Sequence, residues 1–234
     1  MKLVEEGVYC RTFMGLVNVY VLKTPEGVII VDAALNARQM HKLISELPSI
    51  GASVKDVTGV FITHAHPDHV GGLPSLLELL PDSVKVITHA VEAPITRGDV
   101  PMSDKTPEHL NFIARKISDA MPSENPYPAR VDVEVREGDC VGEYFEVIEL
   151  HGHSLGQSGL WWPEKRLLIG GDVMMDLPIF GLIKPLALVT LDMPLAIQSI
   201  HKVAAMPVEI LALGHGAPTK GAHQRIQRLV EKLR

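Results

Sequence analysis

Three histidines and one aspartate occur within six positions of the stretch FITHAHPDHVGG, residues 61–72. His64 and His66 are two residues apart, so in an extended segment both side chains point the same way and can reach one metal ion. Asp68 and His69 follow after the chain turns, and they add a carboxylate and another imidazole. Four ligands are too many for one tetrahedral ion that keeps an open position. The stretch therefore predicts two ligands for each of two ions.

Two ions need further ligands, and three later segments have the form expected of them. Each is an imidazole or a carboxylate beside glycine at the end of an apolar, strand-like run, where glycine lets the backbone turn sharply. They are VIELHGHS with His153, LLIGGD with Asp172 and ILALGH with His215. Any one of them alone would more often be a structural residue. The recurrence of one pattern at three strand ends favours a shared metal site.

The composition of the chain excludes several function classes. Of its 234 residues, 46% are hydrophobic and 21% are charged, which is ordinary for a globular protein. The net charge is -6 without a lysine or arginine cluster, so we expect no nucleic-acid partner. The start, MKLVEEGVYC, is not a signal peptide, and no apolar run approaches the roughly 20 residues that span a bilayer. We therefore expect a cytoplasmic protein without membrane association.

The two cysteines, Cys10 and Cys140, lie outside any C-x-x-C pair. Two buried free thiols are the expected state in a reducing cytoplasm.

The elements that must position the candidate ligands alternate between strand and helix in the first third of the chain. Two β-branched runs, residues 17–22 and 28–31, flank the turn signal at 25–27 and predict a hairpin. Apolar residues at helical spacing predict a helix over 36–47 and a short second helix over 73–80. Further strands are predicted at 57–64 and 84–89, and the first of these delivers the histidine cluster.

A proline-rich insertion at about 93–130, with one helix over 108–120, separates this part from a second set of elements. The later strands are predicted at residues 131–135, 144–150, 158–163, 166–172 and 208–215, with helices at 194–206 and at the end of the chain. We predict a single domain over residues 1–234, made of two halves that each place strand ends at a common edge. The insertion is either a lid or a contact in a homodimer.

The order of the motifs resembles the metallo-β-lactamase superfamily. The pattern comprises His64-x-His66-x-Asp68-His69, Gly152-His153-Ser154, Gly171-Asp172 and Gly214-His215-Gly216. The hairpin NVYVLKTPEGVIIVDAAL, residues 18–35, is similar to the usual opening of the family. The resemblance covers almost the whole chain. It implies an α/β fold, a four-layer αββα sandwich of two mixed β-sheets with outer helices and with the metals at one edge of the sheets.

The resemblance also implies a ligand set for two divalent ions. His64, His66 and His153 would hold the first metal; Asp68, His69 and His215 would hold the second; and Asp172 would bridge the two. Zinc is the expected metal, because imidazole with carboxylate suits it, while iron and manganese accept similar ligands. His151, two residues before His153, is interpreted either as contacting a metal ligand without binding the metal or as facing the substrate.

Two bound zinc ions lower the pKa of a shared water towards about 7. The implied enzyme is therefore a dinuclear metal-dependent hydrolase, whose metal-bound hydroxide attacks a small ester, thioester or lactone. Asp68 and Asp172 are the predicted catalytic carboxylates, which fix the metals and orient the nucleophile. A small-molecule substrate is the expected partner.

The segment after the bridging aspartate separates branches of the family. Glyoxalase II and the persulfide dioxygenases usually carry a Gly-Cys-Gly-Arg stretch there, whereas this chain has VMMDLPIFGLIKPLALVT. The chain is instead similar to stand-alone lactonases and thioesterases, and the alternative is a mononuclear iron oxidoreductase of the persulfide dioxygenase type. Met174, Met175, Ile179 and Phe180 in this segment either line the substrate pocket or pack on the core.

Overall fold

The computed structural model describes residues 1–102 and 125–233. These residues divide into two compact units, the first built from residues 1–100 and 125–135 and the second from 101–102 and 136–233. The helix predicted over 108–120, within the predicted insertion, lies outside the described residues. In the part of the chain that is described, every helix is too short or too polar to cross a membrane.

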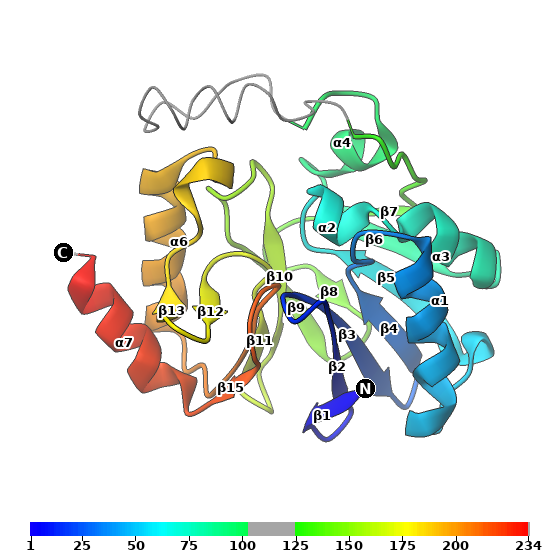
Figure 1. Cartoon of the computed structure of the whole chain (residues 1–234), viewed down its shortest axis with the longest axis horizontal. Helices are drawn as coiled ribbons and strands as arrows, with labels where there is room; N and C mark the ends of the chain where they lie inside the picture. The colour runs from blue at the N-terminus through cyan, green and yellow to red at the C-terminus, as the bar shows by residue number, and fades with distance from the viewer. Residues whose placement is uncertain (103–124, 234) are drawn as a thin grey trace. The chain divides into compact units, whose positions relative to one another are not determined.

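The first unit is built on a seven-stranded sheet whose strands follow one another in chain order (Figure 1). The strands are β1 (Lys2–Glu5), β2 (Val8–Phe13), β3 (Val17–Thr24), β4 (Gly27–Val31), β5 (Val57–Ile62), β6 (Lys85–His89) and β7 (Val133–Val135). The pairs from β1 to β4 are antiparallel and those from β4 to β7 are parallel. The predicted hairpin is confirmed as β3 and β4, with Thr24 opposite Gly27.

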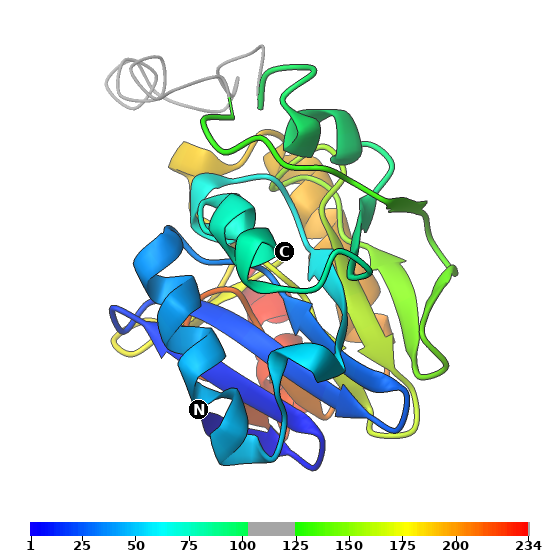
Figure 2. The ribbon, with the colours of Figure 1, turned by 90° about the vertical axis from the view of Figure 1, so that its right-hand side faces the viewer.

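Two helices of the first unit lie over the same face of this sheet, as Figure 2 shows for α1 (Ala37–Glu46) and α3 (Leu73–Leu79). The α1 helix begins after Asn36, whose side chain accepts a hydrogen bond from the backbone N–H of Gln39, the usual N-cap interaction. Its apolar stripe buries Met40 and Leu43. The remaining helical segments are α2 (Pro67–Val70), α4 (Ala93–Arg97) and two 3₁₀ turns, Leu47–Ile50 and Val54–Asp56.

The second unit is built on a six-stranded sheet in the order β15-β14-β11-β10-β9-β8, with a separate hairpin of β12 and β13. The strands are β8 (Cys140–Val141), β9 (Phe145–Glu149), β10 (Ser158–Trp162), β11 (Leu167–Ile169), β12 (Met175–Leu177), β13 (Gly181–Ile183), β14 (Ile210–Ala212) and β15 (Thr219–Lys220). Among the described strands of this sheet, β11 and β14 run parallel and the other pairs are antiparallel. Helices α6 (Met193–Ala205) and α7 (Ala222–Lys232) and a 3₁₀ turn (Ala187–Val189) complete the described part of the unit.

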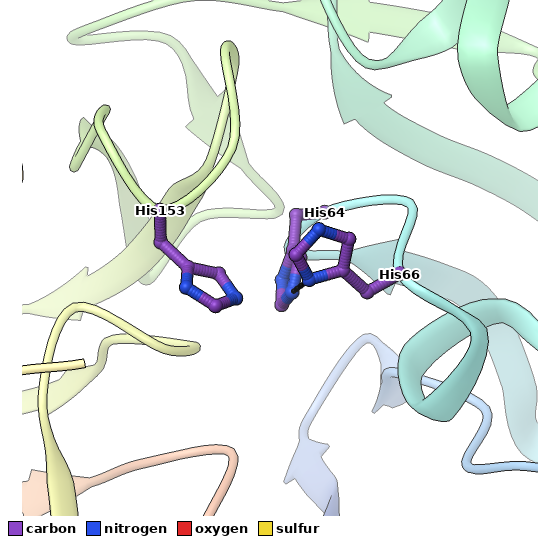
Figure 3. A group of neighbouring side chains, drawn as sticks. All are labelled: His64, His66 and His153. Atoms are coloured by element: carbon purple, nitrogen blue, oxygen red, sulfur yellow. Dashed lines mark hydrogen bonds between the residues drawn. The ribbon is translucent and has the colours of Figure 1, made fainter. Parts of the chain in front are cut away.

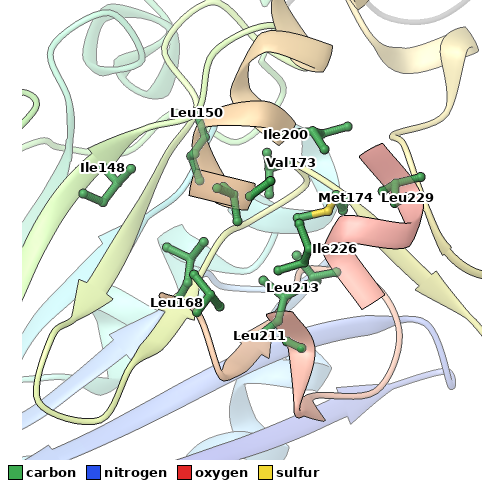
Figure 4. Packing of buried hydrophobic residues seen from close by; sticks show 14 of the residues in the cluster. Ile148, Leu150, Leu168, Val173, Met174, Ile200, Leu211, Leu213, Ile226 and Leu229 are labelled. Carbon is green, nitrogen blue, oxygen red and sulfur yellow. The ribbon is translucent and has the colours of Figure 1, made fainter. Parts of the chain in front are cut away.

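A cluster of buried apolar side chains joins this sheet to α6 and α7 (Figure 4). Its members include Leu150, Leu168, Met174, Ile200, Leu211, Ile226 and Leu229. Met174 is fully buried in the cluster, which favours the core interpretation for this residue. Ile179 and Phe180 are instead 88% and 70% exposed, because they lie in the turn between β12 and β13.

The two cysteines are both free but differ in environment. Cys10 on β2 is buried, as predicted, whereas the prediction of a buried thiol was wrong for Cys140. Side chains alternate between the faces of a strand, and in the two-residue strand β8 it is Val141 that points inward. Cys140 therefore points to the solvent.

This difference predicts two rates of thiol modification. Burial raises the pKa of the Cys10 thiol and shields it, and the thiolate is the reactive form. We expect Ellman's reagent at pH 8 to modify one thiol of the native protein rapidly and the second only in denaturant. The Cys140→Ser variant should lose the rapid phase, and two equally rapid native phases would contradict the assignment.

Candidate metal centre

The histidine cluster of the first unit follows directly from a buried strand. β5 ends at Ile62, the chain bends at Thr63, and His66, whose backbone is extended, is the N-cap residue of the one-turn helix α2. Pro67 begins this helix, and its fixed φ suits the first helical position. The turn predicted after His66 is therefore present, and it brings the ring of His69 to 4.1 Å from the ring of His64, measured between centroids.

His64 and His66 lie as two ligands of one ion would. The Nε2 of His64 is 3.1 Å from the Nδ1 of His66, and the rings meet edge to face at 4.6 Å between centroids. Two ligand atoms of a tetrahedral zinc ion, each bonded at about 2.0–2.1 Å, are roughly 3.3 Å apart. Figure 3 draws these two imidazoles, with a dashed line between the two nitrogens, together with His153.

Asp32 and its hydrogen bonds determine the tautomer of two of these imidazoles. It lies just after β4, is almost fully buried, and accepts hydrogen bonds from Nδ1 of His69 at 2.7 Å and from the hydroxyl of Thr63 at 3.0 Å. Because the Thr63 hydroxyl donates to Asp32, its oxygen accepts from the Nδ1 of His64 at 3.1 Å. The hydrogen-bond network thus places the ring proton on Nδ1 in both histidines and the lone pair on Nε2.

The glycine pair after the cluster allows the loop to pack against the segment that follows β4. A Cβ at Gly72 would collide with the carbonyl oxygen of Ala33, and one at Gly71 with that of Leu35. Backbone hydrogen bonds join the same segments, from the N–H of Ala33 to the carbonyl of His69 at 2.7 Å. This close approach keeps Asp32 within reach of the His69 ring.

The second unit brings two candidate ligands together through its pair of parallel strands. β11 and β14 are neighbours with Ile169 opposite Ala212, so their carboxyl ends lie at the same edge of the sheet. Asp172 follows β11 and His215 follows β14. The Nε2 of His215 is 3.1 Å from the Oδ2 of Asp172.

His153 approaches the same carboxylate oxygen from a third strand end. Its loop follows β9, and its Nε2 is 3.5 Å from the Oδ2 of Asp172. The hydroxyl of Thr190 donates to the carbonyl of Leu186 at 2.8 Å, so its oxygen accepts from the Nδ1 of His153 at 3.2 Å. His153 therefore also carries its lone pair on Nε2, on the side of Asp172.

The structure thus places the predicted residues in two groups. The first unit holds His64, His66, Asp68 and His69, and the second holds His153, Asp172 and His215. Each unit carries members of both predicted ligand sets, and metal binding by these side chains stays a prediction. His151 is apart from the second group, with its Nε2 at 3.8 Å from the Oε2 of Glu149.

Several supporting residues escaped the sequence analysis, among them Asp32, Thr63 and Thr190. Asp32 had a detectable signal, because an acidic residue directly follows the apolar strand VIIV and marks another strand end. The two threonines had none, since a hydroxyl at such positions is common in any loop.

Comparison with known proteins identifies the family to which the chain is similar. The model of the metallo-beta-lactamase superfamily matches residues 13–215. The probable metallo-hydrolase YflN of Bacillus subtilis (strain 168) is 26% identical over 94% of this chain and 88% of its own length.

Solved structures show the same fold. A metallo-beta-lactamase family protein from Thermus thermophilus, TTHA1429, superposes with a TM-score of 0.71 at 22% identity, over 99% of this chain and 80% of its own. TTHA1623, solved in a di-iron-bound form, gives 0.64 at 24% identity, over 93% of this chain and 97% of its own.

The fold and the His and Asp clusters define a metal-binding α/β protein of the hydrolase type, with clusters suited to a dinuclear site. The chain belongs to the metallo-β-lactamase superfamily. The predicted fold class, the αββα sandwich, is confirmed.

Proposed function

We propose that the protein is a dinuclear metal-dependent hydrolase of small esters, thioesters or lactones. The observation that carries the proposal is the position of Asp172. Its Oδ2 faces the Nε2 atoms of His153 and His215, which belong to different predicted ligand sets. A carboxylate in that position fits a bridge between two cations.

The donor set of this chain fits divalent metal ions. Imidazole nitrogens and carboxylate oxygens are the ligands that zinc, iron and manganese accept. His64, His69 and His153 are buried, and each carries its lone pair on Nε2 because its Nδ1 donates a hydrogen bond. A buried carboxylate such as Asp172 is costly without a compensating positive charge, which a bound cation provides.

The residues then have separate tasks. When bound, such ions polarise a carbonyl and lower the pKa of water to about 7. In the proposed assignment, the histidines hold the ions and Asp172 fixes their spacing. The side chain of Asp68 is 29% exposed, against 3% for Asp172. Asp68 is therefore the carboxylate that water can reach, and we assign to it the orientation of the attacking water.

The substrate class rests on the segment that follows Asp172. In place of a Gly-Cys-Gly-Arg stretch, the chain forms the β12–β13 hairpin, whose turn exposes Ile179 and Phe180. These exposed apolar side chains lie close in sequence to Asp172, a candidate metal ligand. Their position favours a substrate with an apolar acyl group. The proposed partner is thus a small molecule.

Metal analysis of protein purified without a chelating tag tests the proposal. We expect two metal ions per chain, with zinc as the main element; iron is measured in parallel, since TTHA1623 was solved in a di-iron-bound form. A panel of lactones, thioesters, phosphodiesters and β-lactams should show hydrolysis of the first two classes, and EDTA should abolish it. One iron per chain with oxygen consumption would instead support the persulfide dioxygenase type.

A further inference from the structure

Arg225 lies on α7 of the second unit and binds the β12–β13 hairpin. Its Nη1 and Nη2 donate to Oδ2 and Oδ1 of Asp176 at 2.7 and 2.8 Å, which is a bidentate pair. The side chain of Asp176 is 11% exposed. Bidentate, partly buried pairs of this kind fix geometry more firmly than a single ion pair at the surface.

Thr219 completes a three-membered network with this pair. Its hydroxyl donates to Oδ2 of Asp176 at 2.8 Å and accepts from Nη1 of Arg225, also at 2.8 Å. Thr219 begins β15 and lies four residues after the candidate ligand His215. The network therefore holds the far end of the loop that carries His215.

The near end of the same loop is bound to the backbone of Asp176. The N–H of Asp176 donates to the carbonyl of His215 at 3.2 Å, and Asp176 forms a parallel bridge with Gly216. Gly216 has φ +94°, and a Cβ there would collide with the carbonyl of Asp176. The backbones approach so closely that a displacement of Asp176 must displace His215.

We infer that Arg225 is a positioning residue for the metal site, acting through Asp176 and Thr219 on the loop that carries His215. This inference rests on the proposed function. The network holds β12, which starts three residues after Asp172, against the His215 loop. It thereby maintains the 3.1 Å separation of the Asp172 and His215 ligand atoms. Loss of the network is expected to lower the affinity for the one ion that His215 binds.

The test is a titration of metal-free protein with Zn²⁺ against a chromophoric competing chelator, which gives two stepwise affinities. Supporting groups around metal ligands typically change affinity by about 10–100-fold. We expect Arg225→Gln to weaken one of the two affinities by about tenfold or more and to leave the other unchanged. Arg225→Lys should lie between, because an ammonium cannot make two parallel hydrogen bonds. Arg228→Gln, an exposed arginine of the same helix, should match the wild type.

A cycle with His215→Ala identifies the affected ion. Arg225→Gln should have no further effect on metal affinity in the His215→Ala background, because the two changes act on one site. Thr219→Val serves as a milder variant if Arg225→Gln fails to fold. Unchanged affinities in folded variants, or an equal loss of affinity for both ions, would overturn this inference and leave the proposed function standing. A wild-type protein that binds no metal would overturn the proposed function and the inference with it.

Discussion

Replacing Asp172 with alanine is expected to abolish hydrolysis and to release at least one metal ion. The Oδ2 of Asp172 faces the Nε2 atoms of both His153 and His215, so this one carboxylate contacts both imidazoles. A bound metal stabilises the charge of the transition state by several kcal/mol. Each loss of about 1.4 kcal/mol lowers the rate tenfold. We therefore expect kcat/KM to fall on the order of a thousandfold.

Metal content by mass spectrometry and kcat/KM on the best substrate of the panel measure the two effects. Glu164→Ala is the matched control, because Glu164 is an exposed carboxylate in a surface turn of the same unit. Thermal unfolding of the metal-free proteins separates a folding defect from loss of a ligand. A folded Asp172→Ala protein with two metals and full activity would refute the bridging role.

The strand ends could be predicted from the sequence because two kinds of signal coincide there. An apolar run that stops at glycine and a polar residue identifies both the strand and the residue at its edge, as at LLIGGD before Val173 and ILALGH before Gly216. The parallel pairing of β11 and β14 then brings Asp172 and His215 together. The same reasoning placed β5 and the turn that follows His66.

The missed elements have no such repeated signal. β12 and β13 are three residues each, too short for an alternating pattern to stand out in a segment that is mainly apolar. Cys140 lies in a two-residue strand, too short for alternation to show which side chain points inward. In both cases the strand is too short for the sequence pattern to identify it.

The supporting residues of the site were missed for a related reason. The hydroxyls of Thr63 and Thr190 accept hydrogen bonds from the ring nitrogens of His64 and His153. A hydroxyl has no spacing rule relative to a ligand, so only coordinates reveal the pair. Asp32 is different, since it ends a strand like the candidate ligands and reaches His69 across 37 residues.

The substitution Asp32→Asn is expected to weaken metal binding by His69 without changing the size of the side chain. The N–H and the hydroxyl of Thr63 both donate to Oδ1 of Asp32, at 2.8 and 3.1 Å, whereas His69 contacts Oδ2, so the amide oxygen of asparagine must take the Oδ1 position that faces Thr63. The amide nitrogen then faces His69 and donates to its Nδ1. This forces the ring proton onto Nε2, the nitrogen that the proposed site requires as a ligand.

We expect one stepwise metal affinity to fall about 10–100-fold in Asp32→Asn, the usual effect of losing the carboxylate behind a metal-bound histidine. The tautomer itself can be read in metal-free protein by long-range ¹H–¹⁵N NMR, where the His69 proton should move from Nδ1 to Nε2. Asp82→Asn makes the same chemical change at an exposed turn of the first unit and should alter neither measurement. If the proton moves and both metal affinities stay at the wild-type values, His69 is not a ligand, because a metal-binding imidazole cannot keep a proton on its coordinating nitrogen.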